Sequence, residues 1–119
     1  MNRKLKKAID DYMKFLRKYY NAKILKAVLF GSAARGEYNK ESDADILIVV
    51  SDSNTKIKDE ISMSAYEIMI KNNVVLSPLV MDNSTFDWYK KNRDPFYRNI
   101  CKDGIDLWTK TPGNLLKFG

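Results

Sequence analysis

The sequence predicts an α+β domain, in which a small mixed β-sheet carries helices packed mainly on one of its faces. Two observations lead to this prediction. Apolar residues recur every three or four positions over residues 3–20 and again over residues 57–71, which is the period of an amphipathic helix. Short apolar runs at residues 24–30, 44–50 and 74–81 have the length and the β-branched content of strands. Strands that alternate with helices in this way favour a sheet covered by helices.

The first half of the chain begins with the long helix over residues 3–20, which Asn21-Ala22 ends. The apolar run that follows it closes at Gly31, as is typical of a buried strand. Residues 32–35 can form a short helical turn, which Gly36 can stop. A polar loop then leads to the second strand, which is rich in β-branched residues.

The second half begins with turn and N-cap residues at 51–54, ahead of the second long helix. Asn72-Asn73 ends that helix. Pro78 interrupts the third apolar run and has no N–H to donate, so this strand is expected at an edge of the sheet or with a bulge. The remaining elements are a helix capped by Asn83 or Ser84, a helix over residues 95–102 and a last edge strand over residues 105–108.

Length and composition are those of one ordinary domain. The 119 residues, 45% of them hydrophobic, predict a single domain over residues 1–119, with a loose tail after Thr109. No apolar run approaches the roughly 20 residues that span a bilayer, so we expect neither a membrane segment nor a signal peptide. Cys101 is the only cysteine, which excludes an internal disulfide and makes the cytoplasm the simplest location.

Charge and composition narrow the possible chemistry. The sequence contains no histidine, which excludes histidine-ligated zinc, Ser-His-Asp triads and histidine acid–base catalysis. The net charge of +6 favours a polyanionic partner such as a nucleotide phosphate chain or nucleic acid. A lysine-rich solvated surface explains the same charge equally well.

Gly31-Ser32 has the features of a phosphate-binding turn. A glycine directly after a buried strand lets the backbone approach a ligand, because no Cβ stands in the way. A short helix that starts at Ser32 would direct its unpaired N–H groups outward, where a phosphate could accept them. Arg35, one turn later, could contact phosphate or brace neighbouring carboxylates.

Asp43 and Asp45 have the features of a metal site. They are two residues apart at the start of a strand, so both side chains point to the same face. Two crowded carboxylates repel each other unless a cation joins them, and Mg²⁺ prefers such oxygen ligands. A metal beside a phosphate-binding turn suits phosphoryl or nucleotidyl transfer.

The combined pattern resembles the minimal nucleotidyltransferases of the DNA polymerase β superfamily. Their signature is Gly-Ser, ten residues and then Asp-x-Asp. Here Gly31-Ser32, residues 33–42 and Asp43-Ala44-Asp45 match that spacing. The commoner extended form of the signature is matched at Arg35, Gly36 and Ser42. The order of the flanking elements is consistent over residues 3–109, so the resemblance covers nearly the whole domain.

The resemblance implies a polymerase-β-type fold and a nucleoside triphosphate substrate, most often ATP. Asp43 and Asp45 would be the catalytic residues and would ligate one or two Mg²⁺ ions. The nucleophile would be a hydroxyl group that attacks the α-phosphate and expels pyrophosphate. The nucleotide-binding residues implied by the motif are Gly31, Ser32, Arg35, Gly36 and Ser42.

The chain departs from the family at one position. Many members carry a third carboxylate on the strand after the second long helix, and residues 74–81 contain no acid. Ser77 is the nearest polar residue that could point into the cleft, and Asp82 is expected to lie too far along the strand. Glu37 and Glu41 in the polar loop are possible substitutes.

Three functions follow as hypotheses. Small relatives of this kind often act as antitoxin partners of HEPN-type ribonucleases, so the first is transfer of AMP to a hydroxyl on such a partner protein. The second is a weakly active or inactive nucleotide-binding module that masks a ribonuclease toxin. The third, suggested by the positive charge alone, is nucleic-acid binding, and we rank a protein acceptor above a nucleic acid.

Overall fold

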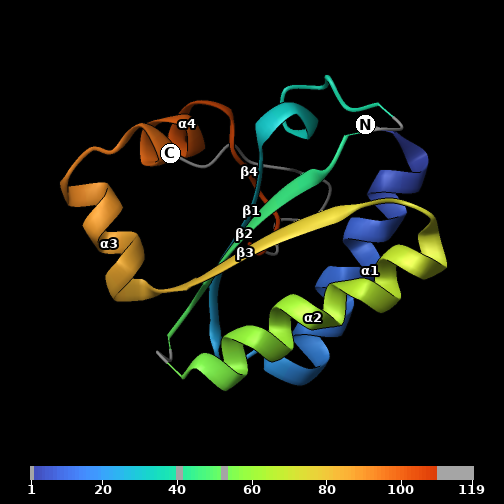
Figure 1. Ribbon diagram of the computed structural model, residues 1–119, viewed down its shortest axis with the longest axis horizontal. Coiled ribbons are helices and arrows are strands. Elements are labelled where there is room, and N and C mark those ends of the chain that lie inside the picture. Colours follow the sequence, from blue (N-terminus) through green and yellow to red (C-terminus); the bar gives the residue numbers. More distant parts are fainter. Residues whose placement is uncertain (1, 40–41, 52–53, 110–119) are drawn as a thin grey trace.

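The computed structural model describes residues 2–39, 42–51 and 54–109 of the chain. Within these ranges the chain forms a mixed sheet with helices on both sides (Figure 1). Residues 110–119, for which the sequence predicts a loose tail, lie outside the described residues. No helix in the described ranges is long and apolar enough to cross a membrane.

The elements follow the predicted order. They are α1 (Arg3–Tyr20), β1 (Ile24–Phe30), the 3₁₀ turn η1 (Gly31–Ala33), β2 (Ala44–Val50), α2 (Thr55–Asn72), β3 (Leu76–Asp82), α3 (Asn83–Lys91), α4 (Pro95–Asp103) and β4 (Ile105–Asp106).

The sheet has the strand order β3-β2-β1-β4. β1 pairs antiparallel with β2 and with β4, whereas β2 and β3 run parallel because α2 carries the chain back between them. The predicted mixed sheet is therefore confirmed.

Pro78 lies on an edge strand, as predicted. The Val75 carbonyl accepts a hydrogen bond from the Ala44 N–H at 2.9 Å, so the backbone groups of alternate residues from Val75 onward point toward β2. The nitrogen of Pro78 consequently faces away from β2, where the ladder needs no donor. Pro78 thus removes no hydrogen bond from the pairing of β3 with β2. On the open edge of β3 it leaves one N–H fewer, so that edge is less suited to pair with another strand.

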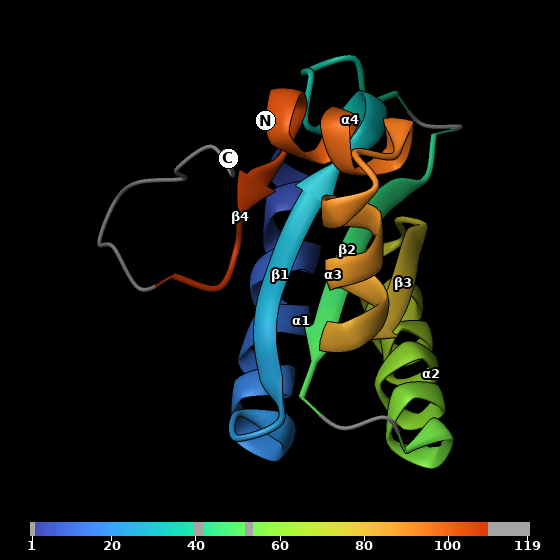
Figure 2. The same cartoon turned by 90° about the vertical axis from the view of Figure 1, so that its left-hand side faces the viewer.

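Two hydrophobic layers enclose the sheet. The long helices α1 and α2 cover one face, and the larger core lies beneath them. The short helices α3 and α4 cover the end of the other face over a smaller core that includes Val28, Leu47 and Val49 (Figure 2). The long helices thus share one face, as expected, and the second core explains why β2 is apolar almost without interruption.

The long helices are joined by polar contacts as well as apolar ones. The Tyr12 hydroxyl, fully buried on α1, donates to the Ile61 carbonyl on α2 at 2.7 Å. Asn72 at the end of α2 donates to the Asp11 carboxylate at 3.1 Å and accepts from Lys7 at 3.2 Å. These contacts hold the end of α2 against α1, and thereby place the segment that leads into β3.

The sequence misplaces two boundaries near the C-terminal end. The N-cap of α3 is Asp82 rather than Asn83 or Ser84, because its carboxylate accepts the Thr85 N–H at 2.8 Å. The last strand stops at Asp106 instead of reaching residue 108. The Asp106 carboxylate accepts the N–H groups of Trp108 and Thr109, at 2.8 and 3.0 Å, which turns the chain away from the sheet.

Candidate functional site

Strand pairing brings the two halves of the motif together. Phe30, the last residue of β1, pairs with Asp45 near the start of β2. Gly31, the next residue, therefore lies directly beside the Asp45 side chain. The antiparallel pairing of β1 and β2 therefore brings together Gly31 and Asp45, which are 14 positions apart in the sequence.

Gly31 could not be replaced by another residue without a change in this arrangement. Its φ of +74° lies in the left-handed region, which favours glycine. A Cβ at this position would also lie 2.4 Å from Asp45 Oδ2. The glycine thus allows the backbone of the turn and the carboxylate to approach each other closely.

Asp43 and Asp45 form an electrostatically unfavourable pair. Burial raises the pKa of the Asp45 carboxyl, and the charge of Asp43 raises that pKa further. Such a pair is more stable when a cation lies between the two carboxylates. Their hard oxygen atoms are the ligands that Mg²⁺ prefers, so this donor set fits the predicted metal.

The repulsion within the pair predicts how stability responds to Asp43→Asn. A raised pKa of Asp45 means that its ionisation opposes folding once the pH exceeds the ordinary value of 3.8. In EDTA near pH 7, Asp43→Asn is therefore expected to increase the free energy of unfolding by about 0.5 kcal/mol, a small gain because solvent screens the exposed Asp43. The gain should shrink as the pH falls toward 3.8.

Urea unfolding of both proteins across this pH range measures the effect. Added Mg²⁺ should reverse the order of stability, because the wild-type pair binds the ion and the variant has lost one of its ligands. A variant less stable than the wild type in EDTA near pH 7 would show that Asp43 makes a stabilising contact instead.

The η1 turn presents backbone donors beside these carboxylates. The Gly31 carbonyl accepts the Arg35 N–H at 3.3 Å, and the Ser32 carbonyl accepts the Glu37 N–H at 2.9 Å. These bonds use the carbonyl groups of the turn, whereas the N–H groups of its first residues have no partner within the turn itself. The predicted short helical turn is present, although it begins at Gly31 instead of Ser32 and ends at Ala33 instead of Arg35.

Arg35 and Gly36 lie at the edge of the site. The Arg35 guanidinium is 3.1 Å from the Glu37 carboxylate and 3.7 Å from the Asp103 carboxylate at the end of α4. Arg35 thus braces carboxylates, but these two and not Asp43 or Asp45. Gly36 has a φ of +79° with nothing close to the position of a Cβ, so its backbone conformation alone favours glycine.

Ser42 stabilises the turn that precedes Asp43. Its N–H donates to the Asn39 carbonyl at 3.0 Å, and its hydroxyl accepts the Asn39 N–H at 3.4 Å. Ser42 thereby closes the loop at its end next to the carboxylates. Glu41, considered as a substitute acid, lies outside the described residues, and Glu37 is engaged by Arg35.

Ser77 occupies the place at which a third carboxylate is expected. It pairs with Asp45 across the parallel β2–β3 ladder, so the two side chains are neighbours on the same face. Asp82 pairs with Val50 at the far end of β3, where it caps α3, and its hydrogen bonds there lower its pKa to about 2. Among the described residues no group of three potential metal-ligating side chains is found.

Tyr38 is a neighbour of the site that the sequence analysis missed. Burial raises the pKa of its hydroxyl, and the negative charge of Asp43 raises it further. The position of Tyr38 in a polar loop does not predict that it lies near Asp43, since only the folded loop brings the two residues together.

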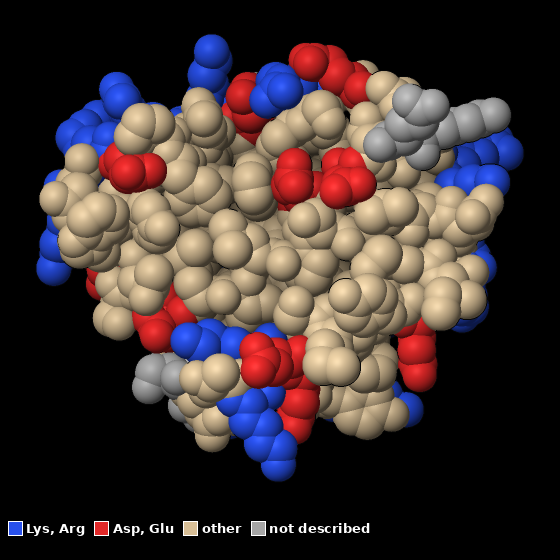
Figure 3. All heavy atoms as spheres, in the orientation of Figure 1, with Lys and Arg blue, Asp and Glu red and all other residues tan. Residues whose placement is uncertain are grey.

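Charged side chains are sparse in the middle of the face shown in Figure 3. In Figure 3 the middle of the face is largely uncharged apart from one group of acidic side chains, and the basic residues lie toward its periphery, several of them beside acidic ones. On this face the positive charge does not form the continuous patch that binding to a nucleic acid backbone would favour.

A sequence model of the nucleotidyltransferase domain family matches residues 8–107. That span includes both halves of the motif and every element of the sheet. The chain belongs to this family. It is a nucleotidyltransferase with a polymerase-β-type fold, in agreement with the resemblance seen in the sequence.

Two curated relatives of this nucleotidyltransferase come from Methanocaldococcus jannaschii, and both bear the name "Putative protein adenylyltransferase". One is 35% identical over 102 residues, which cover 86% of this chain and 96% of the relative. The other is 36% identical over 101 residues, covering 83% and 94%.

Solved structures confirm the fold. A toxin-antitoxin structure with AMP-PNP has a TM-score of 0.57 at 19% identity and covers 86% of this chain and 74% of that one. A spectinomycin adenyltransferase of Enterococcus faecialis, solved with ATP and spectinomycin, has a TM-score of 0.55 at 20% identity and covers 72% and 43%. At these identities the likeness concerns the fold alone.

Proposed function

We propose that this nucleotidyltransferase uses Mg²⁺ and ATP to transfer AMP to a hydroxyl group of a partner protein. The observation that carries the proposal is the contact between Gly31 and Asp45, which joins a phosphate-binding turn to a carboxylate pair. Such a combination serves transfer from a nucleoside triphosphate, because the phosphate chain and the metal must meet at one place.

Each site residue has a role in this reaction. The N–H groups at the start of η1 and the Ser32 hydroxyl would hold the outer phosphates, since these donors lie beside the carboxylates. Asp43 and Asp45 would hold Mg²⁺, which when bound supplies positive charge for the α-phosphate and the leaving pyrophosphate. Arg35, Gly36 and Ser42 would keep the loop in the conformation that brings these groups together.

The reaction is a substitution at phosphorus. The acceptor hydroxyl loses its proton, its oxygen forms a bond to the α-phosphorus, and the bond from that phosphorus to the bridging oxygen breaks. Pyrophosphate leaves, and AMP stays on the acceptor. Ser77, beside Asp45, is neutral and would contribute a hydroxyl instead of a third negative charge.

A protein acceptor is supported by the relatives. The two M. jannaschii proteins carry a name that specifies transfer to protein, and they align over nearly their whole length. Solved structures of the same fold include toxin-antitoxin structures, one of them named MntA-HepT. Together with the resemblance to antitoxin partners of HEPN-type ribonucleases, this supports a HEPN-type ribonuclease as the proposed partner.

Labelling tests this proposal. The chain is incubated with Mg²⁺, the candidate toxin and ATP labelled at either the α- or the γ-phosphate. The α-label should appear on the toxin and the γ-label should not, because AMP rather than phosphate is transferred. Transfer that persists when both Asp43 and Asp45 are replaced by asparagine would contradict the proposal.

The neutral Ser77 also supports a second candidate, a module that binds nucleotide and masks the toxin without turnover. It predicts that the toxin is neutralised in the absence of ATP and by the variant that lacks both aspartates. Neutralisation that requires ATP and both carboxylates would exclude it.

A further inference from the structure

The outward face of α2 carries an exposed apolar stripe. Met63, Tyr66 and Ile70 keep 64%, 61% and 83% of their surfaces exposed. They recur at spacings of three and four, so they form one line along the helix. The buried residues Ile61 and Asn72 each lie two positions from a member of the stripe, which is about 200° around the helix. Because α2 lies on the outside of the molecule (Figure 1), the stripe points away from the sheet.

The two long helices differ in this respect. α1 packs on the same core, but its outward face carries exposed charged residues, among them Lys6, Asp10 and Lys14. A charged outer face is the usual pattern of a surface helix. Within the described residues, the three members of the stripe are instead the most exposed of the large hydrophobic side chains. A helix with apolar side chains on both faces is expected where a second surface covers the outer one.

We propose that the stripe binds a second copy of this chain, with the two α2 helices antiparallel about a two-fold axis. In this arrangement Met63 of each copy packs on Ile70 of the other, because the axis relates the two contacts. Tyr66 lies close to the axis and meets its own counterpart, as suits an aromatic pair. Three apolar side chains from each copy are then removed from water together.

The charges at the two ends of the stripe favour the antiparallel arrangement. The exposed acids Asp59 and Glu60 lie about one turn before the stripe. Lys71 directly follows it, and α1 adds Lys4 at the same end. Antiparallel copies place the acidic end of one beside the basic end of the other, whereas parallel copies would place like charges together. Lys56, another turn earlier, lies beyond the overlap of the two helices.

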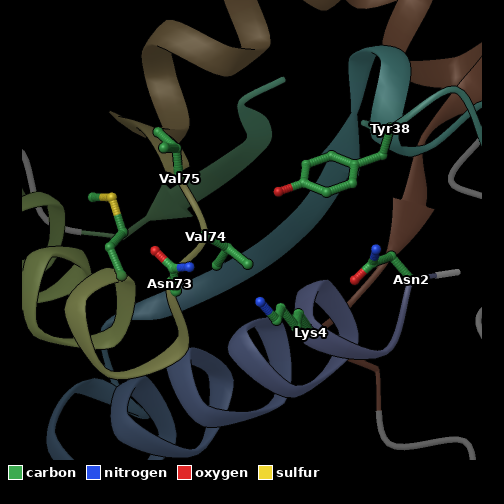
Figure 4. Close-up of a pocket in the computed structure, with 7 residues that line it drawn as sticks. Asn2, Lys4, Tyr38, Asn73, Val74 and Val75 are labelled. Carbon is green, nitrogen blue, oxygen red and sulfur yellow. The ribbon is translucent and has the colours of Figure 1, made fainter. Parts of the chain in front are cut away.

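The place of Lys4 follows from a pocket of about 370 Å³ between the start of α1 and the end of α2, which Lys4 and Asn73 both line. In Figure 4 the Lys4 amine points toward the end of α2. When Ile70 packs on Met63 of the second copy, Asp59 of that copy comes level with residue 74, because each lies four positions from the paired residue. Asp59 then lies beside Asn73 and Lys4, which can both donate to its carboxylate.

The arrangement leaves both active sites open. Ala44, Ile46 and Ile48 of β2 belong to the core beneath α1 and α2. Asp45 alternates with them along the strand, so its side chain points to the opposite face of the sheet. A dimer through α2 therefore keeps the carboxylate pair of each copy accessible, and association can be measured independently of catalysis.

The contact is small and includes one unfavourable pair. Glu67 lies beside the axis in both copies, so two like charges approach each other. Three apolar side chains from each copy also bury less than the roughly 800 Å² per partner of a standard interface. We therefore expect a reversible dimer with a dissociation constant on the order of 10 µM.

Analytical ultracentrifugation over about 1 to 200 µM measures this association. Tyr66→Glu and Ile70→Glu should each raise the dissociation constant by about a hundredfold or more, because a charge enters the contact twice, once from each copy. Tyr19→Glu is the matched control, since Tyr19 is an equally exposed tyrosine (59% against 61% for Tyr66) on α1, outside the stripe. Its dissociation constant should stay within about twofold of the wild-type value. Circular dichroism of each variant verifies folding.

Charge reversal tests the antiparallel orientation. Lys4→Glu combined with Lys71→Glu should weaken association by about tenfold, because acids then face acids. The weakening is expected although these changes lower the net charge from +6 by four, to +2, and so reduce general repulsion. Adding Asp59→Lys and Glu60→Lys to the same chain exchanges the two ends and returns the net charge to +6. Association should then recover to within about threefold of the wild-type value.

Each result has a defined consequence. A wild-type chain that remains monomeric at about 200 µM would overturn the proposal and leave the stripe to a different protein. A dimer that persists in Tyr66→Glu and Ile70→Glu would also overturn it, because another surface would then form the contact. Failure of the fourfold reversal to restore association would show that the antiparallel arrangement is wrong.

Discussion

Asp45→Asn is expected to reduce AMP transfer by about a thousandfold or more, which corresponds to about 4 kcal/mol of lost transition-state stabilisation. Asparagine has the shape of aspartate but lacks its charge, so the pair can no longer hold a divalent ion firmly. The loss should appear in the rate at saturating ATP, since the metal acts on charge that develops during the reaction.

Initial rates of label transfer at saturating ATP measure this effect. Asp10→Asn is the matched control, because it makes the same chemical change on α1, where Asp10 forms an exposed pair with Lys6 at 3.2 Å. That control should retain full activity. An Asp45→Asn rate within about tenfold of the wild-type rate would show that the pair does not carry the metal chemistry.

Gly31→Ala is expected to reduce the rate of transfer by about a hundredfold, although it adds only one methyl group. The new Cβ would lie 2.4 Å from Asp45 Oδ2, so the carboxylate must move away. Because the carboxylate is the far end of a side chain, its displacement costs little stability but misplaces the metal ligand. The positive φ of the residue adds about 1 kcal/mol of destabilisation.

Gly36→Ala separates these two effects. Gly36 has nearly the same φ, +79° against +74°, but a Cβ there would meet nothing within 4 Å. Both variants should therefore lose a similar amount of unfolding free energy, measured with urea, whereas only Gly31→Ala should lose activity. Equal loss of activity in the two variants would mean that loop strain, rather than the position of Asp45, governs the reaction.

Much of the fold could be predicted from local patterns. The helix over residues 3–20 was predicted with its boundaries, because its apolar stripe and its polar face are both complete in the sequence. The first two strands were predicted equally well, since each is a largely apolar run between polar segments. Two errors occurred where side chains cap or turn the chain, at Asp82 and Asp106, because a cap depends on which neighbouring N–H the carboxylate reaches. The third strand begins at Leu76, two residues later than the apolar run predicts.

The candidate site was predictable to the extent that it follows from spacing. Gly31, Ser32, Asp43 and Asp45 stand at fixed intervals in one loop, and the pairing of Phe30 with Asp45 brings them together as expected. The sequence could select Arg35 as a site residue but could not assign its partner. That partner, Asp103, belongs to α4, some 70 residues away in the chain.

The sequence by itself determined the family, the order of the elements and the pair of carboxylates, because these depend on residue type and interval. Only the tertiary structure decided how close Gly31 approaches Asp45, that Ser77 lies beside Asp45, and that Tyr38 lies near enough to Asp43 to feel its charge. These features arise from strand register and from the packing of α1 against α2. Both are set by contacts between segments far apart in the chain, which no local pattern records.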